Sequence, residues 1–145
     1  MRKIYRNCIT PEEAELLLGK QRNKYFIVQK DNNAIVDKVI NVLKTDFDFE
    51  ISNYSKYRVE HRLSGHEWHK DTGSKDHMKW CQIGVSILLK DGDEGGDTFY
   101  SDDITEDKVG IKSDRNVYDM VAHTSDEWHM VTPHSGERLV FLMFI

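Results

Sequence analysis

The sequence predicts an α+β fold in which two helices near the amino terminus pack on one side of a double-sheet β-barrel or jelly roll. Three observations predict it. Apolar residues recur at helical spacing up to about residue 45, strand-like alternation and short apolar runs follow from about residue 46, and turn-forming segments separate those runs. The 145 residues suit one domain over residues 1–145, with a helical part over about 1–45 and a jelly-roll part over about 46–145.

The first helix is predicted to begin after Thr10. Thr10 can cap it, Pro11 suits the first helical position and Glu13 completes a capping box. Gly19 can end this helix. A second helix is predicted over residues 34–44, where five apolar side chains recur at helical spacing: Ile35, Val36, Val39, Ile40 and Leu43.

Strands are predicted in five segments of the remaining chain: FDFEI (47–51), YRVEHRL (57–63), QIGVSILL (82–89), NVYDMVAH (116–123) and RLVFLMFI (138–145). The first two alternate apolar and polar residues, which is typical of a strand with one buried face. The third and the last are nearly continuous apolar runs, which are typical of strands covered on both faces. Turn signals fall at residues 64–65, 71–74, 91–97 and 134–137.

The composition narrows the classes of function. Lys and Arg number 20 against 25 Asp and Glu, and the net charge of −5 argues against binding to the nucleic-acid backbone. The longest apolar run, residues 139–145, is too short to span a membrane, and the amino terminus lacks the apolar core of a signal peptide. With only two cysteines, Cys8 and Cys81, the chain is expected in a reducing, cytoplasmic compartment.

The segment EWHKDTG (67–73) carries a candidate metal site. Strand residues two apart point to the same side, so His69 and Asp71 can aim at one point. An imidazole nitrogen and a carboxylate oxygen suit a divalent transition metal, and a His from another strand would complete a facial triad. By itself the HxD triplet is a weak signal, and a solvated polar strand end is the simpler interpretation.

The carboxyl-terminal segment EWHMVTPHSGERLVFLMFI (127–145) supplies two further candidates. His129 stands at a strand end, where it can serve as the third ligand. Arg138 opens an apolar strand, and a guanidinium group is expensive to bury without a partner. Two interpretations of Arg138 stay open: it binds a ligand carboxylate in a bidentate pair, or it reaches solvent or an acid of residues 91–97.

Together these segments resemble the iron(II)- and 2-oxoglutarate-dependent oxygenases, specifically their compact prolyl-4-hydroxylase-like branch. The resemblance is carried by WHKDT (68–72), VSILLKDGDEGGDTFY (85–100) and HMVTPHSGERLVFLMFI (129–145), in this order. It covers roughly residues 47–145, and the helix opening TPEEAELLL (10–18) also looks like that of the family. The resemblance implies a double-stranded β-helix (jelly roll) fold.

The resemblance also implies roles for individual residues. His69, Asp71 and His129 would ligate Fe(II), and Arg138 would bind the distal carboxylate of 2-oxoglutarate. O2 would be the second cosubstrate, with ascorbate as a candidate additional cofactor. The implied reaction is oxidative decarboxylation of 2-oxoglutarate to succinate and CO2, coupled to hydroxylation of a C–H bond. Within the family, the resemblance favours a prolyl residue in a peptide or protein over a small molecule.

The sequence departs from the family around the cosubstrate. A Tyr that often contacts 2-oxoglutarate in the family falls near Ser86 here, whose hydroxyl could make the same hydrogen bond. Tyr57 and His61 share a face of a predicted strand and are the candidate substitutes. Substrate specificity is expected from the loops at residues 72–80 and 91–108.

The histidines outside the proposed triad are expected on surface strands and turns, with His66 and His77 near enough to the metal to touch substrate. This group comprises His61, His66, His77, His123 and His134.

Two other functions remain open on the same fold. One is a metal-dependent hydrolase that uses bound water at the same three ligands. The other is a non-catalytic barrel domain that binds a metal or ligand. The presence of Arg138 at the cosubstrate position argues against the hydrolase. The oligomeric state is not readable from the sequence.

Overall fold

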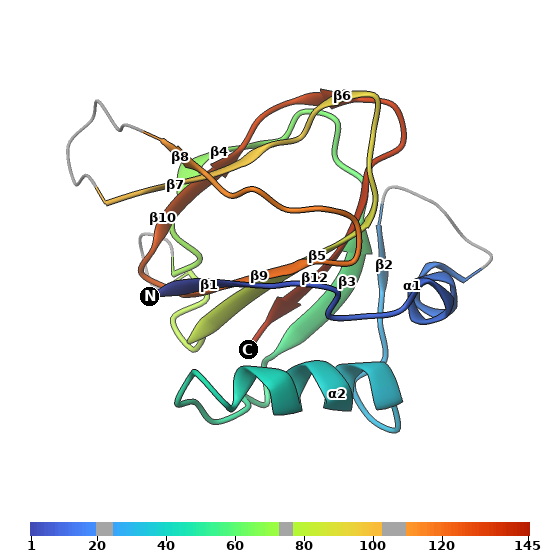
Figure 1. Cartoon of the computed structure of the whole chain (residues 1–145). Helices are drawn as coiled ribbons and strands as arrows, with labels where there is room; N and C mark the ends of the chain where they lie inside the picture. Colours follow the sequence, from blue (N-terminus) through green and yellow to red (C-terminus); the bar gives the residue numbers. More distant parts are fainter. Residues whose placement is uncertain (20–24, 73–76, 103–109) are drawn as a thin grey trace.

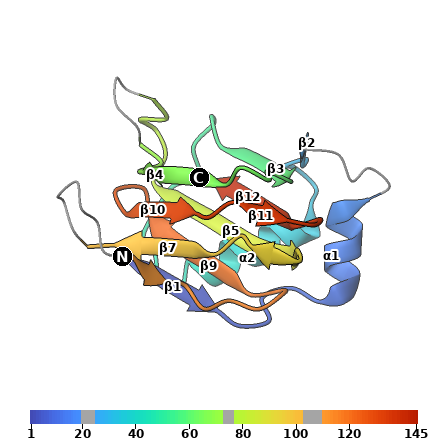
Figure 2. The same ribbon diagram turned by 90° about the horizontal axis from the view of Figure 1, so that it is seen from above.

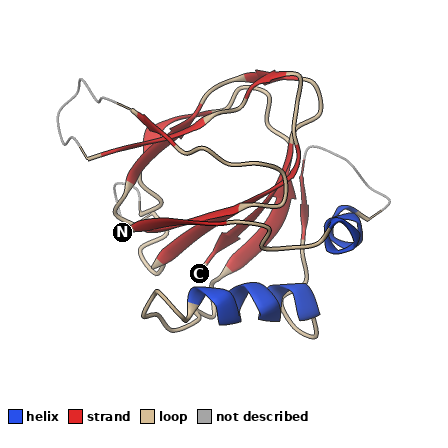
Figure 3. Ribbon diagram, viewed as in Figure 1, coloured by secondary structure: helices blue, strands red, loops and turns tan. Residues whose placement is uncertain are grey.

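The structure is a computed structural model that describes residues 1–19, 25–72, 77–102 and 110–145. The described chain forms a six-stranded sheet, a four-stranded sheet, a two-stranded sheet and two helices (Figure 3). All strand pairs are antiparallel. This agrees with the predicted α+β class and with a jelly-roll-like arrangement of strands.

The six-stranded sheet has the order β1 (Arg2–Tyr5), β9 (Met120–Thr124), β5 (Ile83–Lys90), β12 (Leu139–Phe144), β3 (Lys56–Glu60) and β2 (Tyr25–Ile27). The four-stranded sheet has the order β4 (His66–His69), β10 (Trp128–Val131), β7 (Thr98–Ser101) and β8 (Ile111–Lys112). The two-stranded sheet pairs β11 (His134–Ser135) with β6 (Glu94–Gly95). The four-stranded sheet lies over one face of the six-stranded sheet (Figure 1, Figure 2).

The two helices are α1 (Pro11–Leu18) and α2 (Ala34–Leu43), as predicted. The capping box of α1 is present: Thr10 Oγ1 accepts from the Glu13 N–H at 3.1 Å, and Glu13 Oε1 accepts from the Thr10 N–H at 2.9 Å. The Asn33 side chain caps α2. Helix α2 lies along the face of the six-stranded sheet that is turned away from the other sheet (Figure 1).

Strand alternation divides the six-stranded sheet into two faces. The face toward the helices is apolar and packs with α1 and α2 in one core that includes Tyr57, Val59, Ile83, Val85, Met120, Ala122, Phe141 and Met143. The intervening residues point the other way, toward the four-stranded sheet. This double covering explains the continuous apolar runs in β5 and β12.

Three strand predictions need correction. FDFEI is not a strand; Phe47 and Phe49 alternate because both anchor an irregular segment to the core. The first 45 residues also contribute β1 and β2, which join the six-stranded sheet. The predicted strand at residues 116–123 begins only at Met120, because residues 116–119 form a turn in which the Asp119 carboxylate accepts from the Asn116 N–H. The same carboxylate accepts from the Asn7 N–H, which follows β1.

Cys8 and Cys81 are buried free thiols. Neither helix in the described part of the chain combines the length and apolar character needed to cross a bilayer. Of the loops expected to set specificity, residues 73–76 and 103–108 lie outside the described residues.

Candidate metal and cosubstrate site

A pocket lies between the two large sheets. The six-stranded sheet contributes the side chains that point away from the helices: Arg58, Glu60, Gly84, Ser86, Val121, His123, Val140, Leu142 and Phe144. The four-stranded sheet contributes His66, His69, Thr98, Tyr100, His129 and Val131. Asp71 and Arg138 also line this pocket, so it contains all four residues to which the resemblance gives a principal role.

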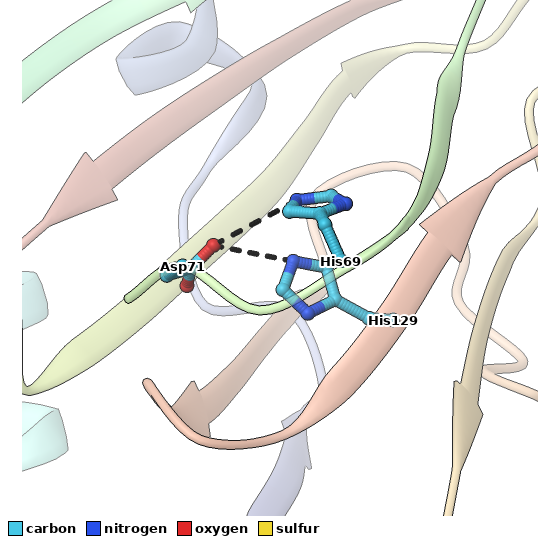
Figure 4. A group of neighbouring side chains, drawn as sticks. All are labelled: His69, Asp71 and His129. Carbon is cyan, nitrogen blue, oxygen red and sulfur yellow. Dashed lines mark ion pairs between the residues drawn. The ribbon is translucent and has the colours of Figure 1, made fainter. Parts of the chain in front are cut away.

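Strand pairing brings the predicted triad together. His69 of β4 is the cross-strand partner of His129 of β10, so their side chains lie on one face of the sheet, with ring centroids 4.2 Å apart. Asp71 follows β4, and its Oδ1 lies 3.2 Å from His129 Nε2 and 3.9 Å from His69 Nε2 (Figure 4). The candidate ligand atoms of the three residues all lie within 4.8 Å of one another.

Backbone carbonyls orient both imidazoles of the triad. His69 Nδ1 lies 2.6 Å from the Glu67 carbonyl oxygen, and His129 Nδ1 lies 2.9 Å from the Glu127 carbonyl oxygen. Because a carbonyl only accepts, each Nδ1 carries the hydrogen and each neutral ring presents the Nε2 lone pair to the pocket. Two lone pairs and a carboxylate oxygen then converge without a hydrogen between them, which is the arrangement that a bound cation would satisfy.

The Asp71 carboxylate is buried but held in its ionised form. Burial by itself raises the pKa of Asp71, yet the hydrogen bond with His123 and the nearby His129 ring outweigh burial and bring the pKa well below its ordinary value. Burial and the neighbouring His129 ring lower the pKa of His69, which favours its neutral form. An ionised carboxylate beside a neutral imidazole is the protonation state that metal coordination requires.

His123 is a member of the site that the sequence did not reveal. It was expected at the surface, but only 5% of it is exposed, and its Nε2 lies 2.7 Å from Asp71 Oδ2. Tyr100 of β7 lies on its other side, with the hydroxyl 2.7 Å from His123 Nδ1. The sequence places His123 on the same strand face as Val121, but only the structure shows that this face lines the pocket.

His134 was also expected at the surface, but only 9% of it is exposed. Its ring contacts His61, with centroids 5.4 Å apart.

Arg138 is 6% exposed. Within the described chain no carboxylate lies within ion-pair distance of it, although Asp91, Asp97 and Glu60 are near enough to favour its charged form. Burial nevertheless lowers the pKa of Arg138. Gly96 packs directly against its side chain, with room for no side chain of its own. A buried guanidinium without a paired acid is a ready binding site for a ligand carboxylate.

A second guanidinium lies close to the same pocket. Arg115 Nη1 donates to the Ser86 carbonyl and to Ser86 Oγ, both at 2.8 Å, and Nη2 donates to Thr98 Oγ1 at 3.4 Å. Burial, together with the positive charge of Arg138, lowers the pKa of Arg115 to about 10. Ser86, a candidate cosubstrate contact, therefore lines the pocket while accepting a hydrogen bond from Arg115.

Tyr57, the other candidate cosubstrate contact, lies elsewhere. Tyr57 is in the helix-side core and only 3% exposed. The residues of β3 that line the pocket are Arg58 and Glu60. Alternation along β3 turns Tyr57 toward α2, so the structure does not bring it to the triad.

Comparison with known proteins gives matches at the level of structure. No family model and no curated protein matches the sequence. A truncated form of the viral collagen prolyl hydroxylase of Paramecium bursaria Chlorella virus 1 superposes with a TM-score of 0.67 at 16% identity, covering 99% of this chain and 87% of that one. A prolyl-4-hydroxylase of Pseudomonas putida gives 0.65 at 14% identity, covering 99% of this chain and 90% of that one.

A 2OG-Fe(II) oxygenase-family oxidoreductase of Burkholderia pseudomallei gives a TM-score of 0.55 at 14% identity, covering 83% of this chain and 64% of that one. At such identities the likeness concerns the fold. The resemblance noticed in the sequence is thus confirmed at that level: the chain has the fold of the prolyl 4-hydroxylases and of 2OG-Fe(II) oxygenases.

Proposed function

We propose that the protein is an Fe(II)- and 2-oxoglutarate-dependent dioxygenase that hydroxylates a C–H bond, built as a single domain with a double-stranded β-helix. One observation carries the proposal. The His69, Asp71 and His129 donors converge in the same pocket as Arg138, a buried guanidinium with no carboxylate within ion-pair distance in the described chain. The three donors suit a metal, and the guanidinium suits a carboxylate.

His69, Asp71 and His129 would hold the metal. Two imidazole nitrogens and one carboxylate oxygen are the donors of the facial triads that bind Fe(II) and leave positions open. Bound there, Fe(II) would supply the activation of O2 that converts 2-oxoglutarate to succinate and CO2 and places one oxygen atom in the product. The protein's own contribution is to fix the ligands, orient the cosubstrate and exclude competing reactions.

Arg138 would bind and orient the distal carboxylate of 2-oxoglutarate through its planar fork of N–H donors. Arg115 adds a second positive charge near Ser86 and Thr98. Two neighbouring cations disfavour each other, and a bound anion would relieve that repulsion. Val140 adds an apolar side chain to the lining of the same pocket.

A prolyl residue in a peptide is the proposed substrate. Support comes from two fold neighbours that are named as prolyl hydroxylases. Leu142 and Phe144 give the pocket an apolar side, and Arg58 and Glu60 line it nearby. An apolar ring attached to a polar backbone would suit such a lining. The measurement is the mass of proline-containing and proline-free peptides after turnover, with a gain of one oxygen atom expected only in the former.

The test of the oxygenase proposal is turnover of 2-oxoglutarate. Protein is prepared without oxygen, supplied with Fe(II) and 2-oxoglutarate, and then exposed to air while succinate is measured. We expect succinate formation, its loss in His129→Ala and Asp71→Ala, and its retention in the control Asp48→Ala, which alters an exposed carboxylate outside the pocket. Absence of both succinate and saturable 2-oxoglutarate binding in the wild-type protein would sink the proposal.

The same assay separates the two other functions. A metal-dependent hydrolase would bind metal through the triad but would be indifferent to substitution of Arg138. A non-catalytic binding domain would take up metal or 2-oxoglutarate without forming succinate.

A further inference from the structure

Asp71 has two oxygens in two different environments. Oδ1 faces the Nε2 atoms of His129 and His69, at 3.2 and 3.9 Å. Oδ2 points away from them, to His123 Nε2 at 2.7 Å. One oxygen is therefore presented to the metal position while the other is held by protein, which makes Asp71 a ligand through a single oxygen.

His123 is in turn fixed by a residue of the opposite sheet. The Tyr100 hydroxyl of β7 lies 2.7 Å from His123 Nδ1 of β9, and both side chains are buried. A phenol keeps its hydrogen at neutral pH, so the Tyr100 hydroxyl donates to His123 Nδ1. The neutral His123 ring must then carry its hydrogen on Nε2, the nitrogen that faces the Asp71 oxygen.

The tautomer of His123 is the reverse of that of the two triad histidines. His69 and His129 have their hydrogens on Nδ1, directed at backbone carbonyls, and offer Nε2 as a lone pair. His123 offers Nε2 as a donor. Three histidines that meet one carboxylate are thus divided into two that can ligate a cation and one that can only hold the carboxylate.

We propose that His123, oriented by Tyr100, is a positioning residue that fixes the Asp71 carboxylate for metal binding through one oxygen. This inference rests on the proposed metal centre and goes beyond it, because neither residue belongs to the triad. The Tyr100 hydroxyl acts through His123, and the pair joins the two sheets across the pocket. Outer hydrogen-bond partners of metal ligands typically contribute about 10- to 100-fold in metal affinity.

The test is titration of the metal-free protein with Co(II), followed by the visible absorption of the bound ion. We expect His123→Leu to weaken Co(II) binding about 10- to 100-fold, and His123→Gln, which keeps an N–H donor, to recover much of that loss. Tyr100→Phe should weaken binding roughly 2- to 10-fold, the worth of one ordinary hydrogen bond. Tyr5→Phe is the matched control, since it removes a tyrosine hydroxyl that donates to Asp46 far from the pocket.

The double variant provides a result that general damage to the fold would not produce. Because Tyr100 acts through His123, adding Tyr100→Phe to His123→Leu should cause no further loss of Co(II) affinity. Additive losses, equal losses in the Leu and Gln variants, or wild-type affinity in both single variants would overturn the inference. If His123→Leu does not fold, Tyr100→Phe against Tyr5→Phe decides alone. Failure of the wild-type protein to bind Co(II) would instead count against the proposed metal centre itself.

Discussion

Gly84 and His123 are cross-strand partners in β5 and β9, and the Asp71 carboxylate lies against both. A methyl group at Gly84 would overlap Asp71 Oδ2 and His123 Nε2. The site therefore requires a residue without a side chain at this point of β5.

Gly84→Ala is predicted to disturb the metal site through contact with Asp71 and His123. The added methyl group must displace Asp71 or His123, so we expect weaker Co(II) binding together with an overpacking penalty of about 1–3 kcal/mol in stability. Co(II) titration and urea unfolding measure the two effects separately. The control is Gly110→Ala, which adds the same group near Phe99, outside the pocket. Equal Co(II) affinity in the two variants would contradict the prediction.

Arg138→Met is predicted to weaken 2-oxoglutarate binding by about 2 kcal/mol or more, roughly 30-fold, because the ligand carboxylate loses a buried charged partner. Arg138→Lys keeps the charge but loses the planar fork, so its loss should be smaller. Calorimetric titration of the anaerobic Co(II) protein measures both. Arg58→Met is the control, since Arg58 lines the pocket but is paired with Glu60 at 3.3 Å. A parallel fall in Co(II) affinity would argue against a role confined to the cosubstrate.

Gly95 and Gly96 form a matched pair for testing the support of Arg138. Both have positive φ, +74° and +73°, so alanine at either position introduces comparable backbone strain of about 1–2 kcal/mol. Only at Gly96 would the methyl group overlap the Arg138 side chain; at Gly95 it would meet the Pro133 carbonyl. We expect both variants to lose stability and Gly96→Ala to lose more 2-oxoglutarate affinity. The reverse order would show that Gly96 does not position Arg138.

Asp119→Asn is predicted to destabilise the protein in a pH-dependent manner. Burial by itself raises the pKa of Asp119, but hydrogen bonds from Asn7, Arg6 and Asn116 outweigh it and hold the pKa below its ordinary value. A depressed folded-state pKa means that the carboxylate stabilises the fold above the unfolded-state pKa of about 3.9 and loses this effect as the pH falls through the folded value.

Urea unfolding of wild-type and Asp119→Asn protein at neutral and acidic pH checks this. The gap in unfolding free energy should be roughly 1–3 kcal/mol at neutral pH and should narrow in acid. Asp48→Asn, at an exposed carboxylate, should leave the midpoint nearly unchanged at both pH values. A gap that stays constant with pH would rule out the ionised carboxylate as its source.

The parts of the fold that were predicted correctly depend on local chemistry. The capping box of Thr10 and Glu13 spans only four residues, and the apolar period of α2 lies within that one helix. FDFEI misled because alternation also arises when Phe47 and Phe49 anchor an irregular segment. Strand β2 escaped prediction because three residues carry too short a pattern, and only its pairing with β3 defines it.

In the site, too, local spacing could be predicted from the sequence, whereas contacts between distant strands could not. His69 and Asp71 could be proposed from spacing, but only the pairing of β4 with β10 places His129 beside them. His123 was hidden because its burial comes from the position of β9 within the sheet and from Tyr100 in the other sheet. Tyr57 was misplaced because a shared strand face does not say which face meets the pocket.

In the six-stranded sheet, the residues that pack in the core and the residues that line the pocket alternate along the central strands. Alternate positions along a strand have different roles: in β12, Phe141 and Met143 pack in the helix-side core, while Val140 and Leu142, which alternate with them, line the pocket. A library confined to the pocket-facing positions could therefore retune what the site accepts while the packing against α2 stays intact. The same strand can then accept substitutions on its pocket side, while the side chains on its helix side must keep their volume.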